Sequence, residues 1–130
     1  MKQLHWALFL TYCGYILWIT LLCRKPSGTR EVQMALLWSY REWLSGNPNG
    51  VQYVRQNLSN ILFFVPFGFL VPAKTWKSAL LISAAFTVFI EASQFAFRLG
   101  LCELDDMLCN VLGAAIGFLF YKLILKWRRK

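Results

Sequence analysis

The fold is decided by the stretch from Ser78 to Gly117, which reads SALLISAAFTVFIEASQFAFRLGLCELDDMLCNVLGAAIG. Its first half is apolar enough to cross a bilayer, yet it contains a carboxylate. On a helix, its polar side chains recur every three or four residues and form one stripe, at Ser83, Thr87, Glu91, Gln94 and Arg98. An ionisable group costs about 2.5–3.5 kcal/mol at the centre of a spanning helix, so we expect the stripe to face protein or water.

A second stripe follows in the next apolar segment. Asp106, Asn110, Gly113 and Gly117 are spaced four, three and four residues apart. Because a short turn joins the two segments, the stripes most simply satisfy their polar groups by facing each other. We therefore predict a polar site between these two helices, with Gln94 and Asn110 at similar depth. The two glycines are expected to let the helices approach closely below that level.

Composition places the chain among membrane proteins. It has 130 residues, of which 58% are hydrophobic and 15% charged, and its mean hydropathy is +0.46. These values favour one membrane domain over residues 1–130. The net charge of +8 comes from basic residues that flank apolar segments, so the expected partners are membrane lipids and not nucleic acid.

The apolar segments predict an all-α bundle of four transmembrane helices. They lie at about residues 4–23, 54–73, 78–97 and 107–125. The first is long for a signal-peptide core and has no small-residue cleavage site before Arg24, so we expect it to stay uncleaved. Pro66 and Gly68 interrupt the second segment, for which a re-entrant loop over 58–73 is the alternative.

The polar connection after the first span is predicted to hold a helix over Glu31 to Ser45. Its aromatic residues Trp38, Tyr40 and Trp43 suit the membrane surface, and a plain solvated loop is the alternative. The sequence Asn47-Pro-Asn-Gly50 then predicts a turn.

No metal ion or other cofactor is expected. The four cysteines form no CxxC pair and accompany a single His, which excludes the spacing of a zinc site. A metal site at Glu91, Asp105 and Asp106 would lack His partners. Cys23 and Cys102 lie near membrane boundaries, and the sequence leaves their pairing open.

The distribution of basic residues predicts the orientation in the membrane. The short connection with Lys74 and Lys77 and the tail from Lys122 onward are densely basic. Basic residues in short loops mark the cytoplasmic side, so both termini are expected there. The outer half of the membrane then contains the polar residues Arg55, Asn60, Glu91, Gln94, Arg98, Asp106 and Asn110.

Three motifs resemble those of the VanZ-like family of small bacterial membrane proteins. They are NILFFVPFGF at 60–69, IEASQ at 90–94 and DDMLCNVLG at 105–113, within a similar region of about residues 55–125. The resemblance implies a helical membrane protein, and some family members are linked to low-level resistance to the glycopeptide teicoplanin. Members often carry a basic residue near position 100, where this chain has Gly100, with Arg98 two residues earlier.

Three functions fit these observations. The leading one is to bind or shield a cell-envelope lipid or lipid-linked precursor at the outer leaflet, with Arg55 and Arg98 holding a phosphate. An intramembrane enzyme with Glu91 as general base, oriented by Asp106, is an alternative, as is a structural bundle without ligand. Interhelical polar contacts contribute only about 0.6 kcal/mol on average in a membrane, which argues against stability alone.

The candidate residues form two groups. The candidate polar site comprises Arg55, Asn60, Glu91, Gln94, Arg98, Asp105, Asp106 and Asn110. Helix packing is assigned to Pro66, Gly68, Gly113 and Gly117.

Overall fold

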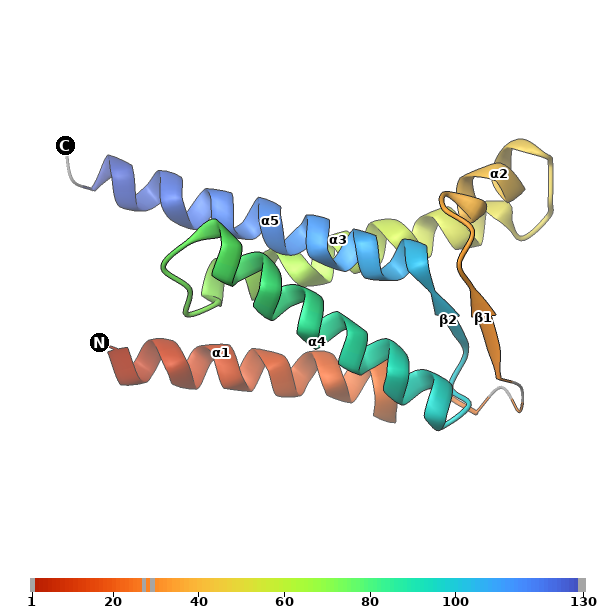
Figure 1. The fold of residues 1–130 in the computed structure, drawn as a ribbon, viewed down its shortest axis with the longest axis horizontal. Coiled ribbons are helices and arrows are strands. Elements are labelled where there is room, and N and C mark those ends of the chain that lie inside the picture. Colours follow the sequence, from red (N-terminus) through yellow and green to blue (C-terminus); the bar gives the residue numbers. More distant parts are fainter. Residues whose placement is uncertain (1, 27, 29, 129–130) are drawn as a thin grey trace.

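The computed structural model describes residues 2–26, 28 and 30–128 and is built around four long helices (Figure 1). They are α1 (Lys2–Leu17), which the π-helix η1 (Trp18–Leu22) continues, α3 (Gly50–Leu70), α4 (Trp76–Ala96) and α5 (Leu104–Trp127). Successive long helices run in opposite directions, and both ends of the chain lie at the same end of the bundle (Figure 1). The all-α prediction is confirmed.

Among the described residues, three helical stretches are long and apolar enough to cross a membrane. They are Gln3–Leu22, Trp76–Ala96 and Leu104–Trp127. The helix α3 is less apolar because its first turns carry polar side chains, but its 21 residues form one helix that continues through Pro66. At 1.5 Å per residue it is about 31 Å long, and it begins four residues before the predicted boundary.

Local sequence signals explain where the helices begin. The hydroxyl of Thr75 accepts the backbone N–H of Ser78 at 3.2 Å, and the Ser78 hydroxyl accepts the backbone N–H of Thr75 at 3.2 Å. This reciprocal cap starts α4. Before α3, the backbone N–H of Asn49 donates to the side-chain oxygen of Asn47 at 2.9 Å and closes the predicted turn.

The predicted helix over Glu31 to Ser45 is wrong in its first half. Residues Glu31–Gln33 form strand β1, which pairs in parallel with β2 (Leu101–Glu103), and only Trp38–Leu44 is helical, as α2. The short turn expected between the two polar stripes contains the partner strand β2. Pairing the two distant segments satisfies their backbone groups, and this tertiary contact overrides local helical propensity.

The closest neighbour of α5 is α3, not α4 as expected. A Cβ atom on Gly113 would overlap with the backbone oxygen of Ile61, and one on Gly117 with that of Val65. Gly68 lies in the same way against the backbone of Ala114. The small residues therefore bring the backbones of α3 and α5 into direct contact.

Apolar and aromatic side chains fill the rest of the interior. Phe9, Phe64, Phe67 and Phe118 are buried, with ring centroids 5.2 Å apart for Phe9 and Phe67. Pro66 lies exposed within α3. All four cysteines, including Cys23 and Cys102, are free thiols.

Candidate functional site

The polar stripe of α4 is buried inside the bundle. Thr87, Glu91 and Gln94 are at most 2% exposed, and Asp106 and Asn110 of α5 are at most 4% exposed. The side-chain N–H of Asn110 donates to the Thr87 hydroxyl at 2.6 Å. The polar residues of the two helices therefore meet, as the spacing predicted.

The predicted pairing of Gln94 with Asn110 is wrong. The side-chain N–H of Gln94 donates to the backbone oxygen of Thr20 in η1 at 3.2 Å. Thr87, the partner of Asn110, precedes Gln94 by seven residues, or about 10 Å along a helix. The antiparallel register of α4 and α5 thus differs by about two turns from the expected one, and Gln94 contacts α1 instead.

Three buried carboxylates gather at the end of the bundle where β2 lies. Glu91, Glu103 and Asp106 are 2%, 7% and 2% exposed. The backbone N–H of Glu103 donates to Glu91 Oε2 at 3.1 Å, and the side chain of Gln56 donates to Asp106 Oδ2 at 3.0 Å. All three carboxylates interact electrostatically with the guanidinium of Arg24.

Glu103 lies outside the membrane-spanning helices, in β2. Burial raises the pKa of its carboxyl from 4.5 to about 7, and the neighbouring charge of Asp106 adds to this rise. Arg24 opposes the shift. The carboxyl group therefore changes its charge near neutral pH.

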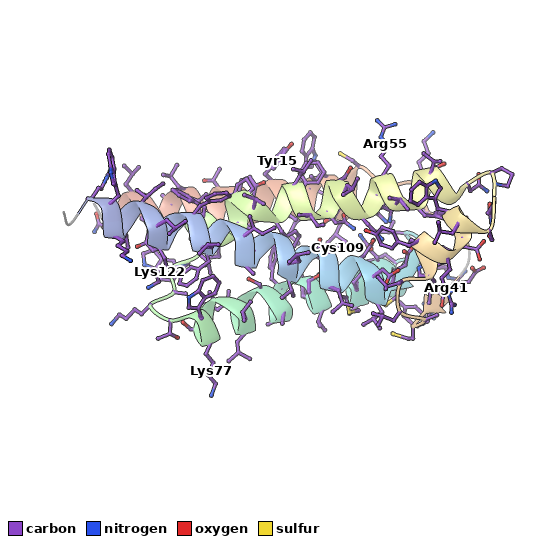
Figure 2. The ribbon with its side chains drawn as sticks, turned by 90° about the horizontal axis from the view of Figure 1, so that it is seen from above. Tyr15, Arg41, Arg55, Lys77, Cys109 and Lys122 are labelled. Carbon is purple, nitrogen blue, oxygen red and sulfur yellow. The ribbon has the colours of Figure 1, made fainter. Side chains whose placement is uncertain are left out.

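Arg24 connects the carboxylates with a cavity between η1 and α3. The cavity has a volume of about 680 Å³. It is lined by Ile19, Thr20, Arg24, Pro48, Val51, Gln52, Arg55, Gln56, Ser59, Asn60 and Phe63. Arg55 projects outward from α3 near α2 (Figure 2). Two guanidinium groups and several amides therefore share one cavity.

Arg24 also lies beside position 100. A Cβ atom on Gly100 would come within 3.3 Å of Arg24 Nη1, and the φ angle of Gly100 is +146°, a conformation that L side chains rarely adopt. The resemblance implied a basic residue near this position. In this chain, the guanidinium comes from Arg24 at the end of the first helix.

Two predicted site residues lie elsewhere. Arg98 follows α4 with a left-handed backbone (φ 57°) and an exposed side chain, and the residues that line the 680 Å³ cavity do not include it. Asp105 is 2% exposed but accepts the backbone N–H of Leu37 at 2.7 Å and the hydroxyl of Ser39 at 3.3 Å. Asp105 therefore anchors the segment between β1 and α2 through its hydrogen bonds, while its charge also acts on Glu103 and Asp106.

Several residues of this region were not singled out from the sequence. The sequence could have identified Gln56 as a site residue, because it precedes Asn60 by four residues and shares its helix face. Thr20 and Arg24 carried no such signal beyond their place at the end of a span. Glu103 lay in a predicted turn and becomes buried only when β2 pairs with β1.

The arrangement suits the binding of an anion. Guanidinium groups hold phosphates through paired hydrogen bonds, and amide side chains add neutral donors. The three buried carboxylates attract the guanidinium of Arg24 and so keep its positive charge at the inner side of the cavity. Among the described residues, no group of three or more His, Cys, Asp or Glu side chains is placed to hold a metal ion.

Comparison with known proteins identifies the family. No solved structure matches this chain. Protein VanZ from Enterococcus faecium is 29% identical over 73 residues, which are 53% of this chain and 45% of that protein, so the match covers less than half of the relative's length. The family model described as VanZ/LLP1 matches residues 9–125. This chain is therefore a membrane protein that belongs to the VanZ/LLP1 family.

Proposed function

We propose that the protein binds the phosphate or pyrophosphate head of a cell-envelope lipid, or of a lipid-linked precursor, in the cavity between η1 and α3. The observation that carries this proposal is that Arg24 and Arg55 line one cavity of about 680 Å³ together with Gln52, Gln56 and Asn60. Every one of these side chains can donate hydrogen bonds to phosphate oxygens.

The buried carboxylates prepare this cavity for its ligand. Gln56 donates to Asp106 with its amide N–H, which fixes its orientation. Arg24 interacts with Glu91, Glu103 and Asp106, so its guanidinium is held in place before a ligand arrives. Such preorganisation lowers the entropic cost of binding. Ile19, Val51 and Phe63 supply apolar lining for the first part of a lipid chain.

In this proposal, α1, α3, α4 and α5 all cross the membrane and both termini are cytoplasmic. The end with the termini carries Lys74, Lys77 and Lys122, which the positive-inside rule assigns to the cytoplasm. The cavity then opens in the outer leaflet, and α2 lies on the outer membrane surface through the exposed side chains of Trp43 and Leu44.

Cysteine labelling of intact cells tests this topology. In a background without the four native cysteines, Asn49→Cys should react with a membrane-impermeant maleimide and Arg128→Cys should not. The reverse pattern would place the cavity in the inner leaflet and exclude an outer-leaflet ligand.

The same cavity offers a route to glycopeptide tolerance, to which the family resemblance points. A protein that holds a lipid-linked precursor by its phosphate makes that precursor less accessible to an antibiotic such as teicoplanin. Deleting the gene should then lower teicoplanin tolerance in the native host. A plasmid copy that carries Arg24→Gln should not restore the tolerance.

Matched lipids test the binding itself. Native mass spectrometry of the purified protein should show binding of a polyprenyl phosphate and much weaker binding of the same polyprenol. Arg24→Gln and Arg55→Gln should each weaken binding by about tenfold, the effect of losing about 1.4 kcal/mol. Arg41→Gln, on α2 and outside the cavity lining, is the control for charge. Equal binding of the phosphate and the alcohol would contradict the proposal.

An intramembrane enzyme is the second candidate, favoured by the position of Glu103. Its pKa of about 7 suits proton transfer at neutral pH, and its backbone contacts Glu91 directly. An enzyme would convert the bound polyprenyl phosphate on long incubation and lose that activity in Glu91→Gln. Recovery of the lipid unchanged would favour binding alone.

A further inference from the structure

A second cavity lies at the opposite end of the bundle, the end that carries both termini (Figure 1). It has a volume of about 350 Å³. Its lining comes from α1, α5 and the connection between α3 and α4, and consists of His5, Trp6, Val71, Pro72, Ala73, Lys74 and Tyr121. It shares no residue with the cavity around Arg24.

The polar side chains of this second cavity all offer hydrogen-bond donors. His5 and Trp6 present ring N–H groups, Tyr121 a hydroxyl and Lys74 an ammonium group, and the lining contains no carboxylate. All six acids of the chain lie in or beside β1, α2, the end of α4, β2 and the start of α5, at the other end of the bundle. The charged side chains at this end of the bundle are therefore basic, which favours an anion in the cavity.

The walls of the second cavity are held by contacts between its elements. The ammonium group of Lys122 donates to the backbone oxygen of Lys74 at 2.7 Å and lies 5.0 Å from the ring centroid of Phe118. The rings of His5 and Tyr121 are 6.4 Å apart and connect α1 with α5. These contacts fix the backbone of Lys74, a lining residue, and add the charge of Lys122 at the edge of the cavity.

We propose that this cavity binds the phosphate group of an anionic phospholipid in the leaflet on the same side of the membrane as the two termini. The donor groups bind the phosphate oxygens, and Val71, Pro72 and the ring of Trp6 contact the glycerol and the first methylene groups. Trp and Tyr side chains favour the headgroup zone of a bilayer, which places the cavity at the depth of lipid phosphates.

Two lysines of the same short connection provide a matched test. Lys74 lines the cavity, whereas Lys77 projects away from the bundle (Figure 2). The backbone oxygen of Lys74, and not its side chain, holds Lys122, so Lys74→Gln keeps that contact. In native mass spectrometry, the wild-type protein should retain phosphatidylglycerol in preference to phosphatidylcholine. Lys74→Gln should weaken this binding about fivefold, as expected for about 1 kcal/mol per lysine at a membrane surface, while Lys77→Gln should not change it.

Three outcomes would overturn the proposal. Equal losses in Lys74→Gln and Lys77→Gln would show attraction by overall charge and not by a site. Equal binding of phosphatidylcholine would show that the anion is not recognised. Displacement of phosphatidylglycerol by millimolar inorganic phosphate would identify a free anion, and not a lipid, as the ligand. Restoration of binding by Lys74→Arg would support the role of the charge at this position.

Discussion

The inward stripe of α5 is built in opposite ways along its length. From Gly113 onward, its glycine face brings Gly113 and Gly117 against the backbone of α3, and Gly68 of α3 lies in the same way against Ala114. Nearer the start of α5, its polar face carries Asn110 against Thr87 of α4, and Asp106 between Gln56 of α3 and Glu91 of α4. The glycine face is shaped for close packing and the polar face for polar contacts.

Burying the polar face costs folding free energy that burying the glycine face does not. Among the described residues, the side-chain oxygens of Gln94 and Asn110 are buried and accept no hydrogen bond. Each such acceptor costs about 1–3 kcal/mol, and apolar side chains of the same size would avoid that cost. We therefore expect the glycine face to set the stability of the bundle and the polar face to serve function.

The largest expected effect comes from the glycine face. In Gly117→Leu, the new side chain would overlap with the backbone of Val65, which cannot move without separating α3 from α5. We expect a loss of stability at or above the upper end of about 1–3 kcal/mol and little protein in the membrane. Gly14→Leu is the control, since a Cβ atom there meets nothing within 4 Å. Normal accumulation of Gly117→Leu, measured by immunoblot, would show that the glycine contact is dispensable.

On the polar face, Glu91→Gln should separate function from folding. The amide keeps the size and an acceptor for the backbone N–H of Glu103, so accumulation should be normal. The variant removes a carboxyl group that interacts with Arg24, so the guanidinium is less well positioned, and we expect polyprenyl phosphate to bind about tenfold more weakly. Glu31→Gln, an exposed acid of β1, is the control. Loss of the protein from the membrane would assign Glu91 to the structure instead.

Disulfide crosslinking can sharpen the register of the polar face. In a background without native cysteines, Thr87→Cys with Asn110→Cys should join readily on mild oxidation, because the native side chains are 2.6 Å apart. Gln94→Cys with Asn110→Cys should join far less. More efficient joining of the second pair, seen as a mobility shift on a non-reducing gel, would support the register predicted from the sequence, in which Gln94 pairs with Asn110.

The smallest expected effect concerns the pH dependence contributed by Glu103. Its pKa is about 7 in the folded protein and 4.5 when unperturbed, so folding favours the protonated form. This contribution to stability is complete below pH 4.5 and is lost as the pH rises through 7. Wild-type protein in detergent should therefore melt at a lower temperature at pH 8 than at pH 5. In Glu103→Gln this difference should shrink by several degrees, and an unchanged difference would show that other groups produce it.

Helix positions and the buried stripe of α4 followed from the sequence because they depend on local spacing. Thr87, Glu91 and Gln94 share one face of any helix that contains them, whatever lies opposite. The cost of exposing Glu91 to lipid then requires that this face be buried, and it is. The same logic placed Asp106 and Asn110 inside.

The sequence could not predict which helix packs on each of these faces, because periodicity does not say which helix lies opposite. Gly113 and Gly117 were assigned to the contact with α4 but pack on α3. Asp105 and Asp106 are adjacent in sequence, but on a helix they point about 100° apart, so Asp105 bonds to Leu37 whereas Asp106 bonds to Gln56. Arg24 reaches the carboxylates from the end of η1, a contact between distant segments that no local pattern predicts.

The central claim is that the cavity at Arg24 and Arg55 holds a phosphate-headed lipid, and the lipids that copurify with the protein test it most directly. The protein should carry Lys74→Gln, which weakens binding at the second cavity, and be extracted from native membranes in mild detergent. Mass spectrometry should then find one lipid with a phosphate or pyrophosphate head on the otherwise unchanged chain. Adding Arg24→Gln and Arg55→Gln should remove it, and adding Arg41→Gln should not. A chain that carries no such lipid, or one that keeps it after both cavity arginines are replaced, would contradict the claim.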